Sequence, residues 1–225
     1  MKKTLLVLFA LMAMAMSACE HRLSGAQRSK VTTQAVQTPY FENIEIAGSY
    51  DVHFTQGDKI SVSVRGTAKS RERLSVQVVG KTLYVKAKSK GYGNFWSDSD
   101  DVDIYVTAPN LLAVSIIGSG EFECEKKIDT SSIKLLITGS GNIDINNLIC
   151  NNITAKIAGS GDIDLKKLVT DTSFFSISGS GDIEVENAKI NKATNKIAGS
   201  GDISITGIVN HHDDNVAGSG DIVIN

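Results

Sequence analysis

Apolar and polar residues alternate in short runs along most of the chain after residue 40, which is the period of β-strands. Around Gly159 the order is Lys-Ile-Ala before the glycine, and Asp-Ile-Asp-Leu follows Gly161. The runs are separated by Gly-Ser-Gly followed by an acid or Asn, at steps of 21, 20, 20, 20 and 19 residues from the first glycine at Gly118 to the last at Gly218. A fixed period of this size predicts a stack of similar units, each burying its apolar face against its neighbours.

Aligning the units on their glycines produces four columns of apolar side chains. One precedes the glycines and three follow them: Ile116, Ile137, Ile157, Ile177, Ile197 and Val216; Phe122, Ile143, Ile163, Ile183, Ile203 and Ile222; Cys124, Ile145, Leu165, Val185, Ile205 and Ile224; Ile128, Leu148, Leu168, Ala188 and Ile208. These columns predict an all-β parallel β-solenoid with about 20 residues per coil, in which like residues stack at the strand spacing of about 4.8 Å. Later positions of each unit show no coherent column. A helical repeat is excluded because the alternation has period 2.

The Gly-Ser-Gly segment is expected to form a sharp corner, where glycine adopts angles that a Cβ forbids and where stacked corners leave little room. An acidic column follows it, consisting of Glu121, Asn142, Asp162, Asp182, Asp202 and Asp221. These side chains are expected to accept backbone N–H groups at the corner. A calcium ladder on Asp162, Asp182, Asp202 and Asp221 is the weaker alternative, because known calcium repeats have a nine-residue period and Asn142 interrupts the charge.

The front of the domain contains a degenerate copy of the unit at residues 46–54, in which Tyr50 replaces the second glycine. Strands are predicted at residues 59–65, 74–79, 82–88 and 102–107, with a tight hairpin at Gly80-Lys81. Residues 40–110 therefore form a less regular β section that continues into the regular coils of residues 111–225.

The N-terminus has the pattern of a secretory signal over residues 1–18: two lysines, an apolar run and small residues before Cys19. The residues from Met16 to Cys19 resemble the bacterial lipoprotein box, with Met16 in place of the usual leucine. We expect cleavage before Cys19 and lipidation of its thiol; an ordinary cleaved signal is the alternative. Residues 19–39 are polar and lack periodicity, so we expect a flexible tether.

Neither the net charge nor the cysteine content of the chain indicates a specific chemical activity. The formal net charge is −2, and no basic stripe with interleaved aromatics is visible along the sequence, which argues against nucleic acid as a partner. Cys124 and Cys150 occupy different phases of the repeat, so we expect buried free thiols, although a disulfide stays open.

Four segments of the chain resemble the head GIN domain family: residues 41–54, residues 80–88, residues 102–123 and the later Gly-Ser-Gly-Asp-Ile copies. The resemblance covers about residues 40–225. It implies a right-handed β-helix-like fold, of a kind common in lipoproteins of Bacteroidetes and described as an adhesin head. The family pattern supplies no catalytic residues.

Three segments are candidate sites. Residues 89–101 hold Tyr92, Phe95 and Trp96 and suit stacking on sugars or a protein; alternatively Trp96 covers an open end of the core. His211-His212-Asp213-Asp214 is expected to bulge from the final coil as a loop rather than to bind metal. Outward charges, such as Asp164, Glu184 and Glu186 with Lys166, Lys167 and Lys189, are expected to be solvated.

The sequence thus predicts a non-enzymatic, lipid-anchored cell-envelope protein, exported and held on the outer membrane, with its membrane face left open. The solenoid is expected to serve as a binding module or as a rigid spacer, without a cofactor. The candidate partners are a glycan, an envelope protein or a second copy of the chain. An enzyme acting on envelope polysaccharide and a carrier of lipid or another apolar ligand are the alternatives. A carrier requires a sizeable cavity, whereas the large Ile and Leu columns predict a filled interior.

Overall fold

The computed structural model describes residues 30–88 and 102–225. All of its strands belong to one sixteen-stranded sheet. The strands are β1 (Thr32–Val36), β2 (Asn43–Gly48), β3 (Asp51–Gln56), β4 (Ser61–Gly66), β5 (Leu74–Val79), β6 (Thr82–Ala87), β7 (Asp103–Ala108), β8 (Ala113–Gly118), β9 (Glu121–Asp129), β10 (Ser132–Gly139), β11 (Asn142–Gly159), β12 (Asp162–Leu165), β13 (Leu168–Gly179), β14 (Ile183–Gly199), β15 (Ile203–Gly218) and β16 (Ile222–Ile224). One helix, α2 (Ala68–Arg73), lies between β4 and β5.

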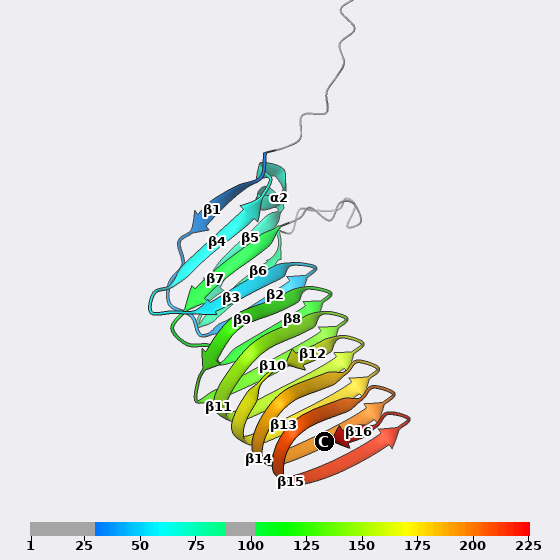
Figure 1. Ribbon diagram of the computed structural model, residues 1–225. Helices are drawn as coiled ribbons and strands as arrows, with labels where there is room; N and C mark the ends of the chain where they lie inside the picture. The colour runs from blue at the N-terminus through cyan, green and yellow to red at the C-terminus, as the bar shows by residue number, and fades with distance from the viewer. Residues whose placement is uncertain (1–29, 89–101) are drawn as a thin grey trace, which may run out of the picture.

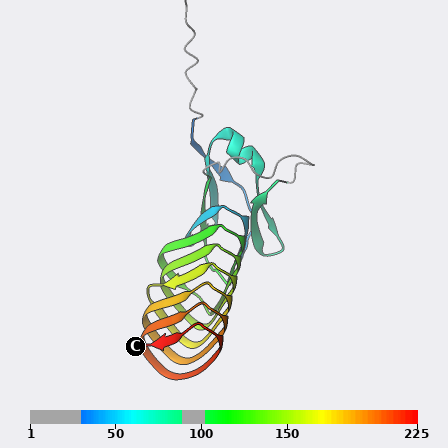
Figure 2. The ribbon, with the colours of Figure 1, turned by 90° about the vertical axis from the view of Figure 1, so that its right-hand side faces the viewer.

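From β8 onward the chain winds into the predicted parallel β-solenoid, whose coils lie in a row in Figure 1 and are seen from the side in Figure 2. Each corner glycine pairs with the corner glycine of the next coil, as in Gly139↔Gly159↔Gly179↔Gly199. The register therefore repeats in steps of 20 residues through the regular coils, and like residues stack above one another. Both the fold class and the coil length predicted from the sequence are confirmed.

Glycine is required at the corners for two separate reasons. Gly159 has φ +141°, a backbone conformation that side chains rarely adopt, and a Cβ there would lie 2.1 Å from the carbonyl oxygen of Gly139. At the second glycine, Gly161, no unusual φ is involved, yet a Cβ would lie 2.1 Å from the Gly141 oxygen. Tyr50 is tolerated in the first copy because β2 and β3 continue to different strands, β6 and β7, so no earlier corner lies against it.

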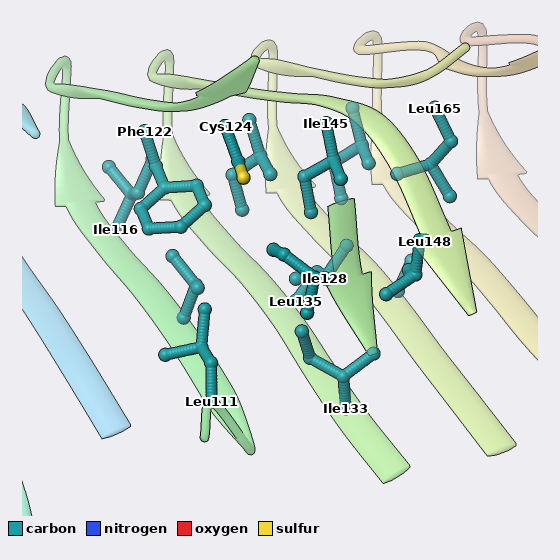
Figure 3. Packing of buried hydrophobic residues seen from close by; sticks show 14 of the residues in the cluster. Leu111, Ile116, Phe122, Cys124, Ile128, Ile133, Leu135, Ile145, Leu148 and Leu165 are labelled. Atoms are coloured by element: carbon teal, nitrogen blue, oxygen red, sulfur yellow. The ribbon is translucent and has the colours of Figure 1, made fainter. Parts of the chain in front are cut away.

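The interior is a continuous aliphatic core (Figure 3), and the predicted columns are buried in every coil up to β14. Three further inward columns were not predicted from the sequence. They are Cys150, Thr170 and Ile190; Ile133, Ile153, Ser173 and Ala193; and Leu135, Ala155, Phe175 and Asn195. Residue size and polarity change from coil to coil in these three columns, so the sequence shows no ladder although the strands stay in register.

The final coil departs from the predicted columns. Val216 is 44% exposed because no further coil covers it, and Ile208 is 60% exposed. Ile208 also leaves its column: Gly207 takes the place opposite Ala188, where a Cβ would lie 2.4 Å from the Ala188 oxygen, and Ile208 pairs with Lys189. The expectation that Ile208 continues the fourth column is therefore wrong.

In the front section the strands predicted before and after the Gly80 hairpin are confirmed, as β4, β5, β6 and β7. The sheet divides here into two arms: β2 continues to the β6–β5 hairpin, while β3 continues to β7, β4 and β1. Helix α2, which the sequence reading did not anticipate, joins the arms at the end of the molecule away from the C-terminus (Figure 2). It begins after Thr67, whose side chain accepts the Ser70 N–H.

The expected tether of residues 19–39 is wrong for its last part, because β1 pairs with β4 over five residues. Four of the five β1 side chains are exposed, so the strand is held by backbone hydrogen bonds and has no alternating pattern to reveal it. Every described strand pairing lies within residues 30–225.

Replacing the glycine at one corner tests whether the stacked corners hold the fold. Gly159→Ala should lower the free energy of unfolding by about 3 kcal/mol or more, because it combines a forbidden φ with overlap on the Gly139 carbonyl. Gly80→Ala is the matched control, since Gly80 has φ +62° but nothing within 4 Å of its would-be Cβ; it should cost only about 1–2 kcal/mol. Urea unfolding measures both, and equal losses would contradict the importance of stacking.

Candidate functional site

Because side chains fill the interior of the coils, a binding site is expected on the outer surface. Two shallow hollows indent it. One of about 530 Å³ lies over β2, β8, β10 and β11, and its lining includes Asn43, Ser115 and Lys134. The other, of about 450 Å³, lies at the α2 end and is lined by residues such as Val36, Arg71 and Val76. Both hollows are open to solvent, and the first reaches the edge of the core at the buried side chains of Ile44 and Ile133.

The acidic column after the corners forms a hydrogen-bonded ladder. The Oδ1 atom of Asp162 accepts the backbone N–H of Asp182 at 2.9 Å, Asp182 accepts that of Asp202 at 2.7 Å, and Asp202 accepts that of Asp221 at 2.7 Å. Each carboxylate thus caps the corner of the following coil rather than its own. This fixed partner offsets the repulsion between neighbouring carboxylates, which amounts to roughly 1 kcal/mol per pair in water.

A second acidic column runs beside the first, through Glu123, Asp144, Asp164 and Glu184. We call the outward surface formed by these two columns the acid face. Burial, followed by the charge of Glu121, raises the pKa of Asp144 above its ordinary value. Burial and the neighbouring Asp144 carboxylate likewise raise the pKa of Asp164, and the two carboxyl groups share a hydrogen bond. Neither hollow is lined by this pair.

The strands before the corners carry the opposite charge. Lys134, Lys156, Lys192 and Lys196 project outward from β10, β11 and β14, and Phe174 of β13 lies among them. We call this surface, made of these five residues and the small polar side chains between them, the lysine face. The Lys156 and Lys196 ammonium groups lie 5.3 Å and 5.7 Å from the centroid of the Phe174 ring.

The sequence reading missed the lysine face and found no basic stripe with aromatics. Apart from Lys192 and Lys196, which share β14, the residues of the lysine face are separated by about one coil along the chain, and only the strand register brings them together. Extending the 20-residue alignment to positions before the corner would have placed Lys156, Ser176 and Lys196 in one column. That alignment was the available signal.

The expected loop at residues 211–214 is wrong, because β15 continues through it and pairs with β14 from Lys192↔His211 to Asn195↔Asp214. His212 and Asp214 occupy inward columns of the last coil. The His212 Nδ1 atom lies 2.7 Å from Asp214 Oδ2, and the Asn195 side-chain amide donates to Asp214 Oδ1 at 2.7 Å. Polar side chains therefore close the open end of the core, which discourages another strand from adding there.

The remaining candidates are placed as follows. Cys124 and Cys150 are buried free thiols, and burial raises the pKa of both. Among the outward charges, Lys166 pairs with Glu186 at 2.9 Å in solvent. Cys19 and the aromatic trio Tyr92, Phe95 and Trp96 lie outside the described residues.

The described part of the chain lacks two features. Within residues 30–88 and 102–225, no cluster of three or more His, Cys, Asp or Glu side chains is arranged to hold a metal ion. In the same part of the chain, no helix is both long and apolar enough to cross a membrane.

The raised pKa values predict a pH-dependent effect of Asp144→Asn. A carboxyl whose pKa is raised on folding favours the folded state at low pH, and this contribution is lost as pH rises through the raised folded pKa. Asp144→Asn should therefore stabilise the protein at pH 7 by about 0.5–1 kcal/mol, since the site is partly exposed. The gain should fall toward zero near pH 3.5.

Urea unfolding at both pH values checks this, with Asp171→Asn as the control because Asp171 is an exposed carboxylate on β13, outside the acid face. A gain at Asp144 that is the same at both pH values, or matched by the control, would contradict a pKa of Asp144 raised by burial and by the Glu121 charge.

Solved structures share this architecture. A putative adhesin from Bacteroides fragilis is 22% identical with a TM-score of 0.70, covering 87% of this chain and 97% of its own. A protein from Parabacteroides distasonis described as a putative lipid binding protein is 23% identical with a TM-score of 0.72, covering 88% and 98%. A putative adhesin from the same organism has 18% identity and a TM-score of 0.59, with the same coverage. These chains have almost no part outside the match, so a polypeptide of this extent forms the fold by itself.

No curated protein gives a significant match to the chain. The sequence model of one family does match, over residues 40–225, and its description is "Putative auto-transporter adhesin, head GIN domain". This match spans both the irregular front section and all the regular coils. The chain is therefore a member of the head GIN domain family.

Proposed function

We propose that the protein is a non-enzymatic, adhesin-like binding module of the cell envelope, exported by residues 1–18 and anchored through lipid on Cys19. The described residues, 30–88 and 102–225, then form an elongated module with long, regular outer faces. Two or more acyl chains on the N-terminal cysteine would hold it stably on a membrane. We place it on the outer membrane.

The observation that supports a binding module best is the contrast between a filled interior and differentiated outer faces. Inside the described coils, large side chains such as Ile116, Phe122 and Leu135 are fully buried and fill the interior. Outside, the acid face and the lysine face present opposite charges on neighbouring surfaces that meet at the Gly-Ser-Gly corner. Such extended surfaces suit a polymer or another protein better than a small molecule, which needs a concave pocket.

Two other functions each have one observation in their favour. The lipid binding named for the Parabacteroides distasonis neighbour would need an apolar cavity, whereas both hollows here are shallow and partly polar. The Asp144–Asp164 pair resembles the paired carboxylates of glycoside-cleaving enzymes. However, it lies on an open surface outside both hollows, where nothing orients a sugar against it.

A binding experiment on the soluble part tests the proposal. The chain from residue 30 to 225 should bind saturably to isolated envelopes or to glycans on an array, without degrading them, and should take up no fluorescent fatty acid. In parallel, the full chain should fractionate with membranes and Cys19→Ser should not. Depolymerised glycan, or stoichiometric fatty-acid uptake, would overturn the proposal in favour of the enzyme or the carrier.

A further inference from the structure

We propose that the lysine face binds an extended polyanionic polysaccharide, one that carries carboxylate or sulfate groups along its length. This rests on the proposed function as a binding module and names its ligand class. The ligand would lie across β10, β11, β13 and β14.

The charge of this surface is of one sign. Each of the four strands has four outward positions before the corner, from residues 132–138, 152–158, 172–178 and 192–198. These positions hold four lysines and no Asp or Glu. Acidic side chains border these positions: Glu45 on β2, Asp213 on β15, and the exposed Asp171 on β13 directly before Thr172. The basic surface is thus about four strands wide, or roughly 14 Å from the first strand to the last.

The four lysines have no counter-ion among the described residues. Within the described residues, none of the four takes part in an ion pair, whereas Lys81, Lys127 and Lys166 all do. The acid face lies across the corner, so its field repels a polyanion and restricts it to the lysine face. Four ammonium groups on one rigid sheet are therefore available to an outside anion.

Phe174 gives the surface an apolar element in its centre. Its ring is half-buried and lies between the ammonium groups of Lys156 and Lys196, at 5.3 Å and 5.7 Å from its centroid. Cation–π attraction of about 0.5–1 kcal/mol at an exposed site positions both lysines around the ring. A flat ring flanked by cations can contact the C–H surface of a sugar while the lysines contact its acidic groups.

The 530 Å³ hollow adjoins this patch and supplies hydrogen-bonding groups. Lys134 belongs to both, and the hollow is also lined by the neutral side chains of Ser132, Asn152, Thr154 and Asn43 and by one carboxylate, that of Glu45 on β2. Amides and hydroxyls of this kind match the hydroxyl groups of a sugar. A membrane surface of anionic headgroups is planar and would not reach into a hollow, and a nucleic acid would find only one aromatic ring for stacking. A charged polysaccharide uses all three elements.

The test uses residues 30–225, polygalacturonate as the anionic probe, and its carboxyl-reduced form as the neutral polymer of the same backbone. Wild type should bind polygalacturonate at least tenfold more tightly than the neutral polymer, with affinity falling as salt rises. Lys156→Gln/Lys196→Gln should lose at least tenfold. Lys167→Gln/Lys189→Gln removes the same charge from exposed positions outside the lysine face and should change affinity less than twofold.

Phe174→Leu keeps the volume of an apolar side chain but removes the ring, and it should weaken binding about threefold to tenfold without changing the salt dependence. Equal loss in the two lysine pairs would show non-specific attraction and overturn the proposal. So would preferential binding to phosphatidylglycerol vesicles or to single-stranded DNA. Binding to the neutral polymer alone would refute the polyanionic ligand but would leave the proposed glycan-binding function standing. Binding to no polymer and to no envelope would refute both the ligand class and the proposed function.

Discussion

The structure depends on the contact between the carbonyl group of one corner glycine and the α-carbon of the next. In the regular coils the N–H of the corner serine donates to the same carbonyl, as Ser160 does to Gly139 at 2.8 Å and Ser180 to Gly159 at 2.8 Å. A side chain on either glycine would overlap the coil before it. Since only glycine permits this approach, every corner lies directly above the last, and the register of the strands on both sides is determined.

This register explains the core and the surface together. Inside, it stacks aliphatic side chains until the last coil, where Asp214 and His212 end the columns with hydrogen-bonded polar groups. Outside, it assembles residues a coil apart in sequence into continuous faces. The acid ladder is tolerable because its carboxylates accept backbone N–H groups. The lysines have no such partner in the described protein, so that face is the one equipped to receive a charged ligand.

The sequence predicted those features that every coil repeats. The period, the three well-formed columns and the corner glycines were readable because the same residue types recur at Ile137, Ile157 and Ile177. Features that depend on register alone were hidden. Ser173 and Asn195 share inward columns with Ile133 and Leu135, and Phe174 meets Lys156 and Lys196 only across strands.

The errors have the same origin. Ile208 was assigned to the fourth column one residue too late, because Gly207 is the residue that pairs with Ala188. The polar residues 211–214 were interpreted as a loop, although they belong to a strand at the open end of the core. Strand β1 was overlooked because its side chains are exposed and only its backbone is engaged. The pattern of apolar and polar residues therefore predicts buried positions well. It predicts strand pairing only where the paired strands also bury side chains.

The central claim, that stacked corners hold the coils in register, is tested most directly by native-state hydrogen exchange at the corner serines. The amides of Ser160, Ser180 and Ser200 should be strongly protected, because each donates to a glycine carbonyl in the preceding coil. Ser219, in the uncovered last coil, should exchange faster. Gly179→Ala should accelerate exchange at Ser180 and Ser200 before it affects Ser140. Corner amides that exchange at the rate of an unstructured peptide, in an otherwise folded protein, would contradict the account.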